Sequence, residues 1–188
     1  MGNITFEVVE NDDIEQCRDL CNELMSFQKS QAVISPEGFN SMNFDTRMKL
    51  SYESALEKQV VIVKDDEEPV GYIFSTIDMV TEEMRDMWPD WVPRIEGGVG
   101  FYPEWLSLPQ KVGCLSNLYL RDAYKGHGYG SKLCEMSMEW LGSFTDVPIS
   151  FVYISNGNDR AYEFYIRKGF IPSHDVFGGF IKAAYFKL

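Results

Sequence analysis

The stretch that most constrains the fold spans residues 118–131 and reads Leu-Tyr-Leu-Arg-Asp-Ala-Tyr-Lys-Gly-His-Gly-Tyr-Gly-Ser. An apolar segment typical of a strand runs into a glycine-rich loop, and the pattern after the loop is typical of a helix. Glycines let backbone N–H groups approach an anion closely, and a helix N-terminus adds unsatisfied donors and the positive end of its dipole. This order of elements therefore predicts a strand–loop–helix unit that binds a phosphate group.

Two well-known phosphate-binding motifs do not match this loop. It is not a P-loop, because Lys132 does not follow a glycine at the required spacing. It is not a Rossmann fingerprint, because its third glycine is misplaced and no acidic residue ends a strand about twenty positions later. From the loop alone, a glycine-rich turn without a ligand stays an open alternative.

Length and charge narrow the class of protein. A chain of 188 residues with 45% hydrophobic and 24% charged residues predicts one globular domain that can bury a core. The formal net charge of -12 argues against a nucleic-acid partner, because the chain as a whole would repel phosphates. Any anionic ligand must therefore be held by a local group of donors.

The sequence also predicts where the chain resides and what it does not bind. It contains no run of eighteen apolar residues and no charged-then-apolar leader, so we expect a soluble, unexported, cytoplasmic protein with no membrane partner. Its four cysteines lack Cys-x-x-Cys spacing and it has two histidines, so we expect reduced thiols and no metal site.

Hydrophobic periodicity predicts alternating strands and helices within one α/β domain, residues 1–188, with helices on both faces of a mixed sheet. The expected strands cover residues 4–10, 60–63, 70–77, 114–120, 149–154 and 180–186. The expected helices begin near residue 14, cover 45–57, run from the glycine loop to about 140, and cover 159–168. Between them, about residues 78–111 form an insertion without regular pattern, rich in aromatic and acidic residues.

A second motif, later in the chain, narrows the interpretation of the glycine loop. Residues 158–170 read Asn-Asp-Arg-Ala-Tyr-Glu-Phe-Tyr-Ile-Arg-Lys-Gly-Phe and fill a predicted helix after a strand. With both motifs in this order, the chain resembles the GNAT superfamily of acyl-coenzyme A-dependent N-acetyltransferases. That family's loop, Gln/Arg-x-x-Gly-x-Gly/Ala, is matched by Lys125, Gly128 and Gly130, with lysine at the first position. Its later motif, Asn-x-x-Ala-x-x-x-Tyr-x-x-x-Gly-Phe, is matched by Asn158, Ala161, Tyr165, Gly169 and Phe170.

The resemblance implies a fold and an activity. The fold would be the GNAT fold, a central mixed, mostly antiparallel twisted sheet of about six to seven strands flanked by about four helices. The activity would be direct transfer of an acetyl group from acetyl-coenzyme A to a primary amine of a small molecule or peptide, without a metal. The alternative is a catalytically silent module on the same fold that binds or senses acyl-coenzyme A.

The resemblance also implies roles for individual residues. One strand segment would part from its neighbour, and its backbone would hydrogen-bond the pantetheine arm and polarise the acetyl carbonyl. The glycine loop would hold the pyrophosphate, with a point charge from the lysine before it. The implied coenzyme-binding residues are Leu118, Tyr119, Leu120, Lys125, Gly126, His127, Gly128, Tyr129, Gly130, Ser131 and Asn158. For His127, a plain exposed side chain is an equal alternative.

The implied catalytic residue is Tyr165, which would protonate the departing thiolate of coenzyme A. A phenol with a reference pKa near 10 suits a thiolate whose own pKa is about 8.5. The competing interpretation is a core aromatic residue, since Tyr165 lies among other aromatic side chains of one helix.

The sequence does not name a general base for the amine. Where members of the family often carry a glutamate, this chain has Cys114 or Ser116, and Tyr153. Either a chain of water molecules removes the proton, or a residue such as Glu104 in the insertion does so. A covalent route through a cysteine is disfavoured, because Cys134 falls in the predicted helix after the loop and Cys114 has no evident histidine partner.

For the insertion we hypothesise a role in choosing the acceptor. Aromatic and carboxylate side chains together favour an acceptor with an apolar body and a cationic amine. The carboxylates are Glu82, Glu83, Asp86, Asp90, Glu96 and Glu104, and the aromatics include Trp88 and Trp91. The alternative is that these aromatic side chains anchor a long loop or form a homodimer contact.

Overall fold

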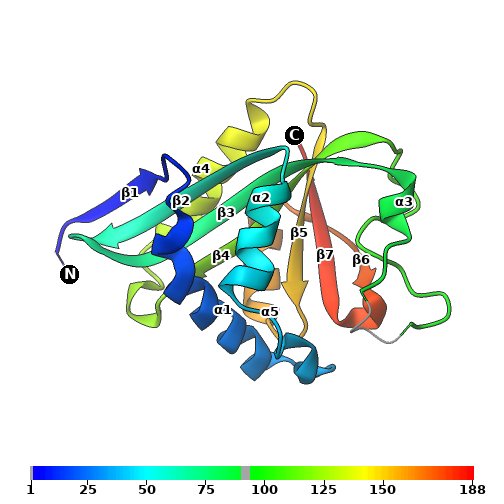
Figure 1. Ribbon diagram of the computed structural model, residues 1–188, viewed down its shortest axis with the longest axis horizontal. Coiled ribbons are helices and arrows are strands. Elements are labelled where there is room, and N and C mark those ends of the chain that lie inside the picture. Colours follow the sequence, from blue (N-terminus) through cyan, green and yellow to red (C-terminus); the bar gives the residue numbers. More distant parts are fainter. Residues whose placement is uncertain (1, 90–93) are drawn as a thin grey trace.

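The computed structural model, which describes residues 2–89 and 94–188, forms a seven-stranded sheet in the order β1-β2-β3-β4-β5-β7-β6 (Figure 1). The β4–β5 pair is parallel and the other neighbouring pairs are antiparallel. The strands are β1 (Ile4–Val8), β2 (Glu57–Asp65), β3 (Glu68–Val80), β4 (Gln110–Leu120), β5 (Ile149–Ser155), β6 (Ile171–Val176) and β7 (Ile181–Lys187). The expected mixed, mostly antiparallel sheet of six to seven strands is confirmed.

Helices cover both faces of this sheet, as expected, with α1 and α2 on one face and α4 and α5 on the other (Figure 1). The α-helices are α1 (Arg18–Gln31), α2 (Leu50–Ser54), α3 (Glu82–Arg85), α4 (Tyr129–Gly142) and α5 (Asp159–Arg167). The short 3-10 or π segments are η1 (Ile14–Cys17), η2 (Pro36–Phe39), η3 (Phe44–Lys49), η4 (Asp122–Tyr124) and η5 (Phe177–Gly179). No helix among the described residues is long and apolar enough to cross a membrane.

Strand β2 shows why two helical layers are needed. Its buried residues alternate between the two faces, as side chains along a strand must. Val60 and Ile62 pack in the core beneath α1 and η3, whereas Val61 and Val63 belong to the core beneath α4. Because both faces of this strand are apolar, both must be covered by helices.

The sheet divides into two halves between β4 and β5. These strands pair only from Gly113 to Leu115 against Ser150 to Val152, and beyond that they diverge (Figure 1). On its other side, β4 carries a β-bulge, since Phe74 of β3 faces Asn117 while the next residue of β3 faces Leu115. Ser116 is the extra residue of the bulge, and it lies where the strands begin to part. The edge of β4 from Ser116 to Leu120 is therefore free of a strand partner on the β5 side.

Two expected boundaries were wrong, and one strand was not predicted. The predicted helix over 45–57 is instead the π-helix η3 followed by α2, which ends at Ser54, because Glu57 already pairs with Ile77 of β3. The insertion is shorter than 78–111, because β3 and β4 stay paired up to Val80 opposite Gln110. Strand β6 was missed, since it is a mostly exposed edge strand that contains Pro172.

Several aromatic side chains of the insertion pack against η5 and β7, beside the half of the sheet that begins with β5. Trp88 and Phe101 contact Phe177 edge-on, with ring centroids 4.9 and 4.8 Å away. Trp105 lies 4.9 Å from the ring of Tyr185 on β7. These contacts favour the alternative in which the aromatics anchor the loop. The predicted roles of Asp90 and Trp91 lie outside the described residues.

Candidate active site

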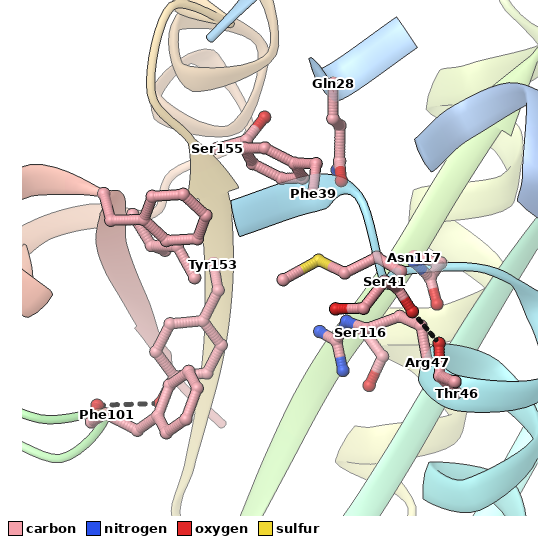
Figure 2. A pocket seen from close by; sticks show the side chains of 13 residues that line it. Gln28, Phe39, Ser41, Thr46, Arg47, Phe101, Ser116, Asn117, Tyr153 and Ser155 are labelled. Atoms are coloured by element: carbon pink, nitrogen blue, oxygen red, sulfur yellow. Dashed lines mark hydrogen bonds between the residues drawn. The ribbon is translucent and has the colours of Figure 1, made fainter. Parts of the chain in front are cut away.

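Two adjoining cavities lie where β4 and β5 part. The small cavity, of about 40 Å³, lies between these strands and is bordered by α1 and α5. The large cavity, of about 260 Å³, lies between β5 and the segment from η2 to η3 (Figure 2). Both share five lining residues, which are Gln28, Ser116, Asn117, Tyr153 and Ser155. The two cavities therefore meet at the β-bulge of β4.

Two buried polar atoms point to a ligand at this junction. Asn117 Oδ1 and Ser155 Oγ have no hydrogen-bond partner among the described residues, although each residue is only 5% exposed. Buried polar groups in folded proteins are almost always paired with protein, water or ligand. Because both residues line both cavities, water or a bound molecule at the junction can supply the missing partner.

The glycine loop has the geometry of an anion site. Gly126 and Gly128 adopt φ values of +84° and +85°, and a Cβ atom built on either meets nothing within 4 Å. Gly128 is the N-cap of α4. The N–H groups of Gly126, His127, Gly128, Gly130 and Ser131 make no hydrogen bond within the described chain. Free donors, open space and a helix N-terminus together suit the expected binding of a phosphate, which stays a prediction.

The side chains of the loop are engaged elsewhere. The ammonium of Lys125 lies 2.5 Å from Asp122 and 5.0 Å from the ring centroid of Phe27. His127 is exposed, and its ring stacks on Tyr129 with the centroids 5.7 Å apart. This position fits the expected backbone contribution of His127, and the point charge of Lys125 on a phosphate stays a prediction.

The three strand residues before the loop differ in their surroundings. Leu118 lines the small cavity. Leu120 is buried in the core beneath α4, and Tyr119 packs against the core beneath α1. Burial and the nearby Glu23 raise the pKa of Tyr119 to about 12. Their expected contribution through the backbone is compatible with the unpaired edge of β4.

Asn158 and Tyr165 both line the small cavity. Asn158 is the N-cap of α5, and its Oδ1 accepts a hydrogen bond of 3.3 Å from the N–H of Ala161. Tyr165 is 6% exposed and packs edge-on against Phe170, yet its hydroxyl has no hydrogen bond to another described residue. Burial raises the pKa of Tyr165 well above its usual value of 10. The core and acid interpretations of Tyr165 are therefore compatible.

None of the residues considered as a general base suits that role. Burial raises the pKa of Cys114 to about 11, which favours the thiol. Tyr153 donates a hydrogen bond of 2.9 Å to the carbonyl oxygen of Phe101, and burial raises its pKa far above 10. Glu104 is exposed and lines neither cavity. Among the described residues that line the two cavities, none is Asp, Glu or His.

Sequence reasoning missed most of the junction. Gln28, Asn117 and Ser155 carry no local signal, because each is polar in a segment that reads as helix or strand. Asn156 was also missed, although its side chain ties three segments together. Its Oδ1 accepts 2.7 Å hydrogen bonds from the N–H groups of Val33 and Ile34, and its Nδ2 donates to Phe180.

Solved structures of acetyltransferases share this fold. The PaiA N-acetyltransferase of Thermoplasma acidophilum, solved with coenzyme A, matches with a TM-score of 0.62 at 14% identity, covering 99% of both chains. Arabidopsis thaliana Naa50, solved with the bisubstrate analogue CoA-Ac-MVNAL, matches at 0.60 with 11% identity over 98% of this chain and 99% of that one. Arabidopsis thaliana NAA60, solved with acetyl-CoA, matches at 0.58 with 11% identity over 99% and 98%. At these identities the likeness establishes the fold.

Comparison of sequences identifies the family to which the chain belongs. No curated protein shows significant similarity to this chain. The family described as Acetyltransferase (GNAT) family matches residues 24–170, which include β4, the glycine loop, α4, β5 and α5. Among the described residues no group of three or more His, Cys, Asp or Glu side chains could hold a metal ion. The family match covers the glycine loop and both cavity-lining strands, and the chain belongs to the GNAT family of acetyltransferases.

Proposed function

We propose that this protein transfers an acetyl group from acetyl-coenzyme A directly to a primary amine that enters the large cavity. The observation that carries the proposal is the junction of two cavities at Ser116, Asn117 and Tyr153. Two substrates that occupy adjoining cavities can meet without displacing one another, which direct transfer requires.

The glycine loop and the residues around the small cavity fit acetyl-coenzyme A. The loop at Gly126 and Gly128 offers free N–H groups for the pyrophosphate, and the unpaired edge of β4 offers backbone groups to the pantetheine arm. The orphaned Asn117 and Ser155 supply further polar atoms at the junction. When bound, the coenzyme supplies a thioester whose carbonyl carbon is open to attack by an amine.

The chain then contributes a carbonyl-binding edge and a proton donor. Backbone N–H groups on the free edge of β4 stabilise the negative charge that develops on the carbonyl oxygen. Tyr165 holds a proton at Oη at neutral pH, because its usual pKa of 10 already lies above neutrality and burial raises the pKa further. A protonated phenol beside the small cavity is suited to supply that proton to a departing thiolate.

The amine must lose a proton before it attacks, and the described cavity lining offers no carboxylate or imidazole for this step. We infer that the proton passes to water in the large cavity. The rate should then follow the fraction of amine that is neutral in solution.

The test is thiol release from acetyl-coenzyme A with a panel of primary amines. Amine-dependent release, with an N-acetylated product seen by mass spectrometry, would support the proposal. Tight binding of the coenzyme with no amine-dependent release would instead support the alternative of a silent acyl-coenzyme A-binding module.

Three finer expectations stay predictions. The first is a cationic acceptor with an apolar body, and Phe101 is the insertion residue that lines the large cavity. The others are a homodimer contact through the insertion and a cytoplasmic location. Sedimentation of the purified protein tests the homodimer, and imaging of the tagged protein tests the location.

A further inference from the structure

The large cavity contains one charged side chain among its described lining residues, Arg47 (Figure 2). Arg47 is half-buried, and its guanidinium has no ion pair or hydrogen bond within the described chain. The other lining residues are neutral.

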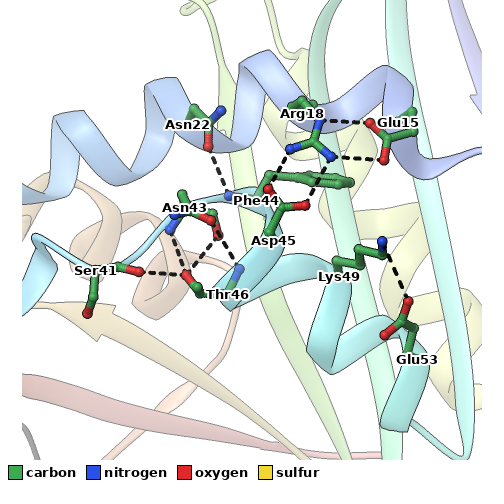
Figure 3. A network of polar contacts seen from close by, with 10 residues as sticks. All are labelled: Glu15, Arg18, Asn22, Ser41, Asn43, Phe44, Asp45, Thr46, Lys49 and Glu53. Carbon is green, nitrogen blue, oxygen red and sulfur yellow. Dashed lines mark hydrogen bonds and ion pairs between the residues drawn. The ribbon is translucent and has the colours of Figure 1, made fainter.

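The segment that carries Arg47 is firmly held on α1 (Figure 3). Asn43 and Thr46 form a capping box at the start of η3, and Thr46 Oγ1 donates to Ser41 at 2.6 Å. The N–H of Phe44 donates to Asn22 of α1 at 2.9 Å. Single-turn π-helices of this kind are frequent at functional sites. The backbone that carries Arg47 is therefore held in place by contacts within the chain.

The neighbours of Arg47 on the same π-helix behave differently. Asp45 accepts hydrogen bonds of 2.7 and 3.0 Å from Arg18, and Lys49 lies 4.0 Å from Glu53 (Figure 3). The chain carries 29 acidic residues, yet none described pairs with Arg47. A guanidinium left unpaired beside a cavity in so acidic a protein indicates an anionic ligand there.

We propose that Arg47 binds a carboxylate of the acceptor, so that the preferred acceptor is a small amine that also carries a carboxylate, such as a free amino acid. This inference rests on the proposed function, since it concerns the substrate that the large cavity receives. A planar guanidinium binds a carboxylate through two parallel hydrogen bonds, which fixes orientation as well as affinity. The volume of about 260 Å³ suits a molecule of this size.

The same charge acts against the cationic acceptor expected from the sequence. A second positive group in the large cavity would be repelled by Arg47, with no described carboxylate in the lining to offset it. The reacting amine itself attacks in its neutral form and is not penalised. Acceptors with a second ammonium group should therefore be poorer than amino acids of similar size.

The experiment compares amino acids with their carboxamides as acceptors, using the intact protein and acetyl-coenzyme A. Because the amine of the amide is the less basic, kcat/KM is expressed throughout per concentration of neutral amine. On this basis a charge-assisted bidentate contact should make kcat/KM for the acid about 10- to 100-fold higher than for the matched amide. Arg47→Gln should abolish this preference, so that the ratio of kcat/KM for the acid to kcat/KM for the amide falls to about 1. Lys49→Gln removes the same charge from the same π-helix, on a side chain outside the cavity, and should leave the preference intact.

The outcomes separate this inference from the proposed function. Equal kcat/KM for acids and amides, or an unchanged preference in Arg47→Gln, would overturn the role of Arg47 and leave acetyl transfer in place. A preference for diamines over amino acids would likewise overturn the role of Arg47 and leave acetyl transfer in place. If no amine in the panel releases thiol although the coenzyme binds, the proposed function fails, and the inference fails with it. Circular dichroism and urea unfolding confirm that both variants fold.

Discussion

Tyr165 combines a buried ring with a hydroxyl that has no partner among the described residues. Tyr165→Phe keeps the ring and removes the proton that a leaving thiolate needs. We expect kcat to fall by about 100-fold or more, as for loss of a general acid, while the dissociation constant of acetyl-coenzyme A changes by less than about threefold. Steady-state kinetics and isothermal titration measure the two quantities. An unchanged kcat would remove the acid role and leave Tyr165 as a packing residue.

The raised pKa of Tyr165 also predicts the pH dependence of turnover. An acid works below its own pKa, so a pKa raised above 10 by burial extends the working range toward alkaline pH. We expect kcat to stay level or to rise between pH 8 and pH 10, because the amine is increasingly neutral and the phenol still protonated. A pH profile at saturating substrates measures this. A fall in kcat with a midpoint below pH 9 would contradict the assignment.

At the scale of single residues, the sequence predicted those site residues that belong to local motifs. Asn158 and Tyr165 both line the small cavity, and Gly126 and Gly128 do adopt the positive φ that the motif needs. Arg47 and Asn117 were not predicted. Their significance depends on a cavity between segments that lie 70 residues apart in the sequence, and no local spacing encodes it.

At the scale of elements, the turn from β4 into α4 allows a direct test of coenzyme binding. Gly128→Leu places a side chain at φ +85°, where strain costs about 1–2 kcal/mol, and fills space that is empty of protein atoms. We expect the fold to survive and coenzyme binding to fall below detection in isothermal titration. Gly142→Ala is the matched control at the other end of α4, because its Cβ also meets no atom within 4 Å. Retained binding in Gly128→Leu would refute the phosphate-binding role of the loop.

The elements that were predicted poorly have identifiable physical reasons. Strand β6 contains Pro172 and polar residues, because an edge strand needs few apolar side chains. The π-helix η3 has the apolar spacing of a helix, so periodicity alone merged it with α2. Gly157 was not singled out, although a Cβ there would lie 1.9 Å from the carbonyl oxygen of Gln31 at the end of α1. Such a close approach of two elements is invisible in one sequence.

At the scale of the whole molecule, a substitution in the insertion tests whether this segment serves stability or acceptor binding. Trp88 packs on Phe177 at the edge of the sheet and is absent from the lining of both cavities. We expect Trp88→Ala to lower the free energy of unfolding by about 2 kcal/mol or more and to change KM for the acceptor by less than about threefold. Urea unfolding and steady-state kinetics measure these. A loss of more than tenfold in acceptor affinity, in a folded and monodisperse protein, would favour the substrate role instead.

The short pairing between β4 and β5 has a mechanical consequence for the whole molecule. The half of the sheet that ends at β4 carries the glycine loop, whereas the half that begins with β5 carries α5 and Tyr165. Three residue pairs join the halves, so a small rotation about that joint would displace Tyr165 from the free edge of β4 without breaking either half. The packing of Leu133 and Cys134 of α4 in one core with Tyr165 resists such a rotation. The position of Tyr165, the proposed proton donor, relative to the free edge of β4 therefore depends on this core packing as well as on the three strand pairs.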